Sequence, residues 1–486
     1  MIASTAVPET SQPLARRQKI ASAVLLAACF LCFAWDGLGA RWADDDMMNL
    51  YQAWQPGPWQ LLLSQLRPWH GGYRPMGGAF YAVLYATFGL NPLPYRVAIL
   101  LLLGFNLWLI YRLARMLGCD ELRAAVAVIL ASYHAGLGSL HYNTDVIYDI
   151  LCFTFYLGAF LYYASIRRRG RLLGRWESAA FFGLFLCALN AKEMAVTLPV
   201  AMLAYEALYH RPAKWSWSAA RAWLFGPGRL ALYTIPLNLL YLYGKAYGPD
   251  PLLSVPGYQP VFSLDRFLTF QTTSVGGFLL RLAPAGTLGL LAAWTLLTWL
   301  AWRNDRPVLR FCWALLIVAP LPIEFLGRYQ AALYIPFAAL AVFAATVLVD
   351  VAEAAARSLA ALPVLRRCGR NIILAALLMA ALVPYVRVNW RIRNTLIHHA
   401  MVTQGTLTWK AIQQFRAVKP KVPPGSSLWI LNDPFRSFDE LYIASLCLGD
   451  RSLKVHLQSL SQPSPEEIAA APHVLAYQNG ELVQIR

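Results

Sequence analysis

Stretches of about 20 apolar residues recur along most of this chain, and they constrain its fold more than any other feature. A helix of that length crosses the hydrocarbon core of a bilayer. Only 14% of the 486 residues are charged, whereas soluble domains carry roughly 25%. We therefore expect an all-α polytopic membrane bundle of about 11 transmembrane helices. The candidate spans are 20–38, 92–115, 122–140, 146–165, 177–191, 194–209, 229–247, 282–302, 309–325, 330–350 and 372–388.

Positive charge predicts the orientation, because Lys and Arg crowd cytoplasmic loops. With a cytoplasmic arm over 1–19, arginine clusters such as Arg167–Arg169 and Arg366–Arg367 fall on the inner side. An odd number of spans then places the C-terminus outside. The net charge of +17 is explained by these loops. No run of basic residues coincides with a nucleic-acid recognition motif, so the charge gives no support to nucleic-acid binding.

The ends of the chain differ from its middle. A transmembrane domain is expected over 20–390, with a long first outer loop over 39–91 and an interfacial helix at 75–89. From 395 to 486 the composition changes. Strands are expected at Ser427–Asp433 and Leu453–Leu457, with a helix at Phe438–Leu448 between them. Residues 395–486 therefore read as a small α/β domain outside the membrane, and helices at 408–418 and 465–471 are expected to add to it.

Three consecutive carboxylates, Asp44, Asp45 and Asp46, follow the first span. A carboxylate there can act as a general base on an acceptor hydroxyl. Neighbouring carboxylates also raise one another's pKa or bind a divalent cation such as Mg²⁺ or Mn²⁺, for which Asp44 and Asp46 are candidates. The alternative is a solvated acidic loop. No cofactor other than such a cation is expected.

Further polar residues fall at the predicted outer ends of spans, where ionisable groups need a partner or a cavity. Asp145 and Asp149 share a helix face, although a helix cap would also explain Asp145. Lys192 and Glu193 interrupt a long apolar run, either as a turn or as part of a site. The other substrate-binding candidates, among which arginine suits phosphate oxygens, are Arg74, Arg281, Glu324, Arg328 and Tyr329.

These pieces, in this order, resemble membrane glycosyltransferases of the GT-C superfamily. The likeness is to the protein O-mannosyltransferases, the transmembrane-and-TPR mannosyltransferases and the aminoarabinose transferases that modify lipid A. It covers roughly 20–390, whereas 395–486 matches none of these groups. The segments that carry it are Asp44–Asp46, YRPMGGAFYAVLYATFGLNPLPYRVAILLL (73–102), HYNTDVIYDILCFTFYL (141–157), AKEMAVTLP (191–199) and GRYQAALYIPFAAL (327–340).

The resemblance implies a GT-C helical bundle, a donor sugar on a polyprenyl monophosphate, and a catalytic base in the acidic motif, for which Asp45 is favoured. It implies inverting transfer to a glycan, lipid or protein hydroxyl at the outer face of the membrane. The compact loops, without added eukaryotic domains, favour a bacterial inner membrane with a periplasmic active face. The competing hypothesis is a transporter or a flippase for a polyprenyl-linked sugar. Against it, the sequence has no inverted repeat of broken spans, and its acidic residues gather at one predicted face.

Overall fold

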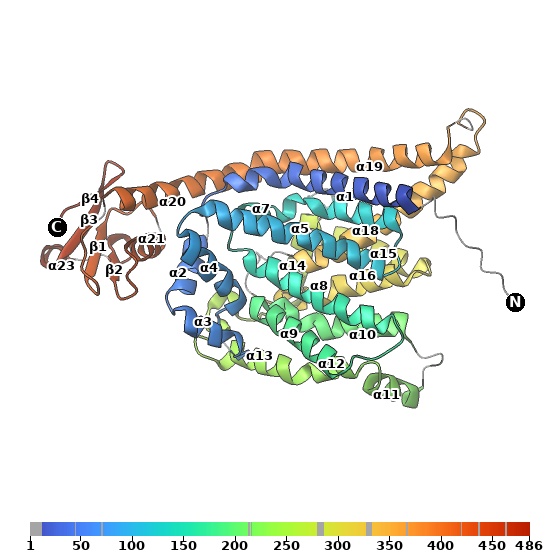
Figure 1. The fold of residues 1–486 in the computed structure, drawn as a ribbon, viewed down its shortest axis with the longest axis horizontal. Helices are drawn as coiled ribbons and strands as arrows, with labels where there is room; N and C mark the ends of the chain where they lie inside the picture. Colours follow the sequence, from blue (N-terminus) through green and yellow to red (C-terminus); the bar gives the residue numbers. More distant parts are fainter. Residues whose placement is uncertain are drawn as a thin grey trace.

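The protein is a long helical bundle with a small sheet-containing domain at one end (Figure 1). The computed structural model describes residues 12–43, 45–69, 71–211, 214, 216–278, 286–326, 333–365, 368–418, 420–435, 438–461 and 464–486. The helices of the bundle are α1 (Gln12–Ala34), α5 (Pro92–Met116), α6 (Glu121–Ser132), α7 (Ser139–Tyr142), α8 (Ile147–Arg167), α9 (Arg175–Ala191), α10 (Leu198–Tyr209), α11 (Trp217–Phe225), α12 (Arg229–Tyr233), α13 (Ile235–Tyr247), α14 (Leu264–Phe278), α15 (Thr287–Arg303), α16 (Pro307–Val318), α17 (Leu321–Glu324), α18 (Tyr334–Ala360) and α19 (Arg370–Ile392).

Within the described residues, six segments are long and apolar enough to cross a membrane. They are Ser22–Gly39, Pro92–Met116, Ile147–Arg167, Pro307–Glu324, Tyr334–Ala360 and Arg370–Thr395. The helices α9 and α15, at 17 residues each, fall just short, since 17 residues extend about 25 Å. The predicted all-α membrane bundle is confirmed as a fold class, with shorter helices completing it.

Several predicted spans are interrupted. The single span expected over 122–140 is wrong, because α6 ends at Ser132 and a 3-10 turn and α7 follow. There the side chain of Asn389 accepts the Ala135 N–H at 2.7 Å and replaces a helical bond. The span expected over 229–247 divides at Thr234 into α12 and α13, since Pro236 has no N–H to continue the ladder. The sequence analysis did not foresee α14.

Three short helices lie at the end of the bundle that faces the sheet domain (Figure 1); we call this the outer end, after the predicted orientation. They are α2 (Asp46–Trp54), α3 (Pro58–Gln65) and α4 (Pro75–Phe88). Pro75 occupies the first turn of α4, as expected. A Cβ atom on Gly77 would lie 2.1 Å from Tyr148 Cε1, so glycine is required for α4 to approach α8 this closely.

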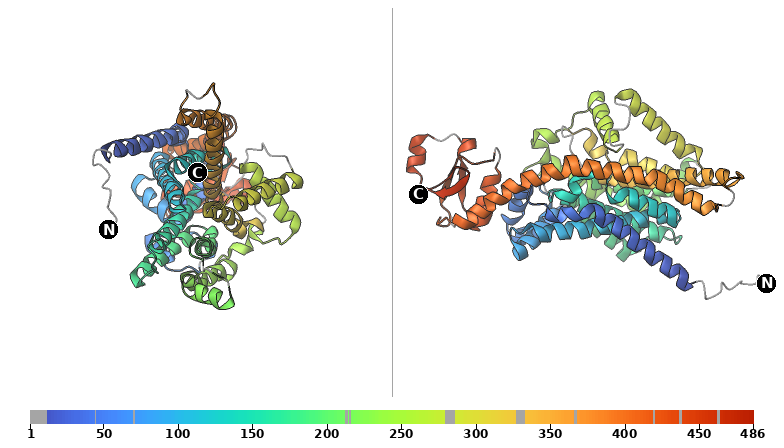
Figure 2. Two further views of the ribbon diagram at one scale, coloured as in Figure 1. Left: turned by 90° about the vertical axis from the view of Figure 1, so that its right-hand side faces the viewer. Right: turned by 90° about the horizontal axis from the view of Figure 1, so that it is seen from above.

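The C-terminal domain hangs on a continuous helical arm. A π-helical turn at Arg393–Ile397 joins α19 to α20 (His398–Val418), which extends beyond the bundle (Figure 2). The sheet has the order β2-β1-β3-β4, in which only β4 is antiparallel to its neighbour. Its elements are β1 (Ser427–Leu431), α21 (Asp439–Leu448), β2 (Lys454–Leu457), α22 (Gln458–Ser461), α23 (Pro465–Ala470), β3 (His473–Gln478) and β4 (Glu481–Gln484). The strands and helices expected here are present, and β3 and β4 were missed.

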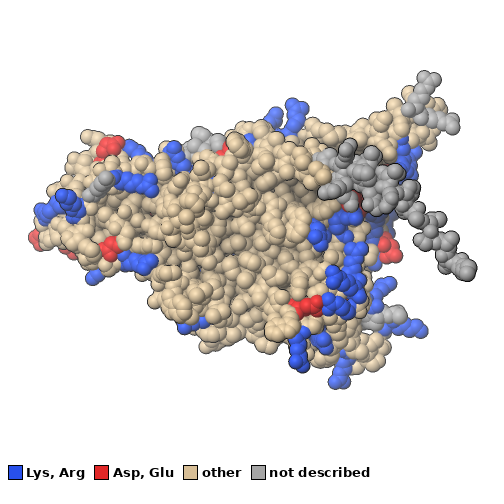
Figure 3. Space-filling view, viewed as in Figure 1, with Lys and Arg blue, Asp and Glu red and all other residues tan. Residues whose placement is uncertain are grey.

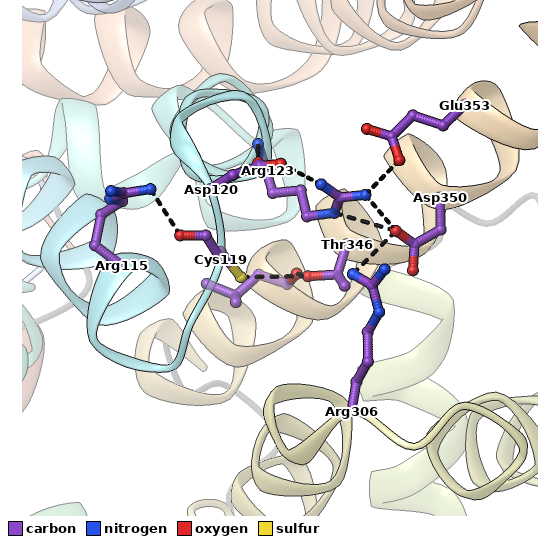
Figure 4. A network of polar contacts seen from close by, with 9 residues as sticks. Arg115, Cys119, Asp120, Arg123, Arg306, Thr346, Asp350 and Glu353 are labelled. Atoms are coloured by element: carbon purple, nitrogen blue, oxygen red, sulfur yellow. Dashed lines mark hydrogen bonds and ion pairs between the residues drawn. The ribbon is translucent and has the colours of Figure 1, made fainter. Parts of the chain in front are cut away.

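Charge is segregated along the molecule. A broad belt in the middle of the visible face carries little charge, and Lys and Arg gather at the end opposite the sheet domain (Figure 3). At that end the Arg123 guanidinium, only 8% exposed, contacts the carboxylates of Asp120, Asp350 and Glu353 (Figure 4). Arg306 also pairs with Asp350, at 3.1 Å. This network ties α6 to α18 and to the turn between α15 and α16.

We expect Arg123→Ala to lower the apparent unfolding temperature of the detergent-solubilised protein by several degrees, because it leaves the carboxylates of Asp350 and Glu353 without their main cation. Thermal unfolding monitored by intrinsic fluorescence measures this. The control is Arg357→Ala, an exposed arginine on the same helix α18. Equal effects of the two substitutions would contradict a specific stabilising role for the network.

A second expectation concerns pH and Glu440, which is fully buried and accepts a bond from the Tyr477 hydroxyl at 2.7 Å. Burial raises the pKa of Glu440 from 4.5 to about 8. The folded state therefore binds this proton more tightly than the unfolded state, so stability falls as pH rises from about 4.5 to 8. Glu440→Gln should weaken this dependence. Hydrogen exchange of β3 at pH 5.5 and 8.5 measures it, and identical pH responses of wild type and variant would contradict it.

Candidate active site

Asp46 is the carboxylate of the acidic motif that the surrounding protein holds most firmly. It occupies the first turn of α2 and is fully buried. Its Oδ1 accepts the backbone N–H groups of Thr144 and Asp145, both at 2.8 Å. Its Oδ2 accepts the Ala43 N–H at 2.9 Å and lies 3.3 Å from Arg96 Nη2. Both oxygens are thus engaged, and Asp46 fixes the first outer loop to the turn that precedes α8.

Asp45 lies in a different environment from its neighbour. It is the N-cap residue of α2, its side chain is exposed, and that side chain makes no capping bond. Asp45 is therefore an accessible carboxylate on a backbone that Asp46 anchors. Asp44 lies outside the described residues.

A second cluster contains two cations and one carboxylate. Arg74 donates from Nε and Nη2 to the two carboxylate oxygens of Glu193, each at 3.0 Å. Lys245 Nζ lies 3.5 Å from Glu193 Oε1. Burial alone would raise the pKa of Glu193, but the charges of Arg74 and Lys245 outweigh it and lower this pKa well below its ordinary value. Glu193 is therefore ionised at neutral pH, and these three side chains together carry one net positive charge.

Lys192 and Asp149 form a separate pair beside this cluster. Lys192 Nζ lies 2.6 Å from both carboxylate oxygens of Asp149. Lys192 caps the C-terminus of α9, and Asp149 is in the first turn of α8. The N-cap residue of α8 is Val146, so capping of this helix does not account for Asp145. The turn at Lys192–Glu193 thus contributes one residue to each of two ion pairs.

Tyr148 connects the acidic loop to the cationic cluster. Its hydroxyl donates to Asn49 Oδ1 on α2 at 3.0 Å. The guanidinium of Arg74 lies 5.5 Å from the centroid of the same ring. Tyr148 therefore links α2, the helix that Asp45 begins, to the guanidinium of Arg74.

The remaining candidates divide into two groups. Glu324 is buried on α17 and accepts a bond from Gln271. It lies beside the 3-10 helix Glu193–Thr197, which packs against α17, but no described contact joins it to the cationic cluster. The candidates that lie outside the described residues are Arg281, Arg328 and Tyr329.

Sequence reasoning did not select Arg96, Asn49 or Tyr148 as site residues. Arg96 had a signal, because an arginine at the start of an apolar span needs a partner. Tyr148 and Asn49 had no such signal, since their roles depend on how closely α2, α4 and α8 pack.

The expected divalent cation remains a prediction. Among the described residues, no group of three or more His, Cys, Asp or Glu side chains converges to bind a metal. Asp46, one of the two candidate ligands, has both oxygens occupied by hydrogen bonds from the protein. The described carboxylates therefore do not by themselves form a metal site.

Comparison with known proteins identifies the architecture. No family model and no curated protein matches this sequence. Among solved structures, ArnT from Cupriavidus metallidurans bound to undecaprenyl phosphate aligns with a TM-score of 0.52 and 16% identity, covering 93% of this chain and 92% of that one. The apo state of the same protein aligns with a TM-score of 0.51. An Archaeoglobus fulgidus oligosaccharyltransferase tethered to an acceptor peptide aligns with a TM-score of 0.50 and 11% identity, covering 90% of this chain and 63% of that one.

The chain has a GT-C fold. The resemblance noted from the sequence is thereby confirmed at the level of fold. It extends beyond the expected 20–390, because 93% of the chain aligns with ArnT. The GT-C bundle brings the first outer loop, the start of α8 and the turn after α9 together, which explains why residues so distant in sequence form one cluster.

The Glu193 cluster leads to a stability prediction. Glu193→Gln should destabilise the protein by about 3 kcal/mol at pH 7, because it leaves two largely buried cations without a counter-charge. Thermal unfolding in detergent measures this. The folded-state pKa of Glu193 is depressed, so its contribution is present at neutral pH and is lost only as pH falls well below 4.5.

The matched control is Glu177→Gln, which breaks a similar two-point contact with Arg171 at an exposed site. An exposed pair contributes little to stability. If the two substitutions were equally mild, Glu193 would not be the essential counter-ion of Arg74 and Lys245.

Proposed function

We propose that this protein is a membrane glycosyltransferase that moves a sugar from a polyprenyl-monophosphate donor to an acceptor hydroxyl at the outer face of a bacterial inner membrane. The observation that carries the proposal is an exposed carboxylate, Asp45, anchored by the buried Asp46 in a GT-C fold. Its helix α2 is linked through Tyr148 to the cationic cluster. The ArnT structure that this chain resembles was solved with undecaprenyl phosphate bound.

The proposed donor site is built around Arg74 and Lys245. A sugar phosphodiester carries one negative charge, and the cluster carries one net positive charge. Because Arg74 already gives Nε and Nη2 to Glu193, the attraction to a phosphate comes from the net charge of the cluster rather than from a free arginine fork. As the sugar leaves, charge accumulates on the phosphate, and fixed cations stabilise that charge without reorganising. Arg281 and Arg328 remain further candidates for the same task.

The proposed reaction is a single displacement. Asp45 takes the proton of the acceptor hydroxyl as its oxygen attacks the anomeric carbon. The bond from this carbon to the phosphate oxygen breaks, and the electron pair leaves with the polyprenyl phosphate. Attack opposite to the leaving group inverts the anomeric centre. Asp46 positions Asp45 without contacting substrate, because its own oxygens are occupied.

Asp45→Asn should lower the transfer rate by about 100-fold or more, since the base is removed, while the unfolding temperature stays unchanged because the side chain is exposed. The assay follows transfer from radiolabelled undecaprenyl-phosphate hexose to a crude envelope fraction by purified protein. Asp305→Asn, a 96% exposed carboxylate at the opposite end of the bundle, should transfer normally.

Two outcomes would contradict the proposal. Full activity of Asp45→Asn would exclude this residue as the base. Absence of transfer by the wild type, combined with protein-dependent movement of the labelled lipid between liposome leaflets, would favour the flippase.

A further inference from the structure

The C-terminal domain is docked directly onto the loop that carries Asp45. Helix α21 packs against α2 and α20. The hydroxyl of Tyr85, on α4, donates to the Leu446 carbonyl at 2.9 Å. The guanidinium of Arg451 lies 5.1 Å from the centroid of the Trp54 ring on α2. Contacts from both α2 and α4 therefore fix this domain against the proposed active site.

An aromatic pair lies where α21 of the C-terminal domain packs against α2 of the first outer loop; we call this contact the seam. The ring centroids of Tyr51, on α2, and Tyr442, on α21, are 5.2 Å apart and the rings are tilted by 38°. Both side chains are partly exposed. Within the described residues, neither hydroxyl has a hydrogen-bond partner, and neither is among the buried unsatisfied groups. Among the described residues, therefore, no side chain or backbone group occupies either hydroxyl.

The charge of Asp45 connects this pair to the chemistry. Burial raises the pKa of the Tyr442 hydroxyl, and the negative charges of Asp439 and Asp45 raise it further. Asp45 begins α2, and Tyr51 follows it on the same helix by less than two turns, so the segment that carries the carboxylate also carries one ring of the pair.

We propose that Tyr51 and Tyr442 form the acceptor-binding surface and that the acceptor is a saccharide. This inference rests on the proposed function: with the donor phosphate at Arg74 and Lys245, an inverting displacement needs the acceptor on the opposite side of the anomeric carbon. The base must lie on that same side, and Asp45 is exposed at the start of the helix that carries Tyr51.

The chemistry of the seam favours a sugar over a peptide. A sugar ring presents an apolar C–H face and a rim of hydroxyls, which match an aromatic face with a polar tip. An extended peptide is commonly recognised through main-chain bonds at a sheet edge. The seam consists of two helices, α2 and α21, and includes no strand edge.

The test uses the full-length protein with radiolabelled undecaprenyl-phosphate hexose and two acceptor pools from a bacterial envelope, an extracted glycolipid fraction and a delipidated protein fraction. Wild type should label the glycolipid pool. Tyr442→Ala should raise the half-saturating amount of this pool by about ten-fold while the KM for donor changes less than about two-fold. Tyr442→Phe keeps the ring and should show a smaller rise, which separates acceptor binding from a loss of packing.

The control is Tyr247→Ala, an exposed tyrosine at the end of α13, which should leave both values unchanged. An unchanged acceptor dependence in Tyr442→Ala would overturn the inference while the proposed function stands. Labelling of the protein pool alone would overturn the saccharide assignment. No transfer to either pool by wild type would instead refute the proposed function itself.

Discussion

The buried ion pair between Asp46 and Arg96 is the constraint on which the outer end of the molecule depends. Arg96 is 1% exposed, and besides Asp46 it donates to the carbonyls of Ala40 and Arg41. Asp46 in turn accepts three backbone N–H groups. One charge pair therefore connects the end of the first span, α2, α5 and the approach to α8. Such a pair is costly to bury, and its many hydrogen bonds offset that cost.

The same arrangement gives the two adjacent carboxylates, Asp45 and Asp46, different environments. Asp46 is occupied and rigid, so the backbone of Asp45 is fixed while its side chain stays exposed. A general base must be accessible and well positioned at once, and one residue with both oxygens buried cannot meet the first requirement. Under the proposed function, Asp46 would support the loop and Asp45 would be the reactive group, with Asp44 outside the described residues.

Sequence reasoning reached the fold class, the helix of α4 and most of the C-terminal elements, because apolar length, Pro75 and strand-forming runs act locally. It failed where tertiary contacts override the local signal. The break after Ser132 depends on the distant Asn389, and α14 is an amphipathic helix of 15 residues that hydropathy does not mark as a span. In the site, the charged candidates could be chosen individually, but the pairing of Arg74 with Glu193 and of Lys192 with Asp149 could not, since it depends on helix packing.

The C-terminal domain is a further case in which helix packing, and not the local sequence, gives the relevant information. Its sequence resembled none of the groups that the bundle resembled, so nothing local connected it with catalysis. Its position connects it with the acidic loop, because α21 lies against α2 and the Tyr442 ring packs against that of Tyr51, less than two helical turns after Asp45. Under the proposed function, a change of acceptor would therefore be accommodated on α21 and α2, whereas the cationic cluster of Arg74 and Lys245 would keep its role with the lipid-linked donor.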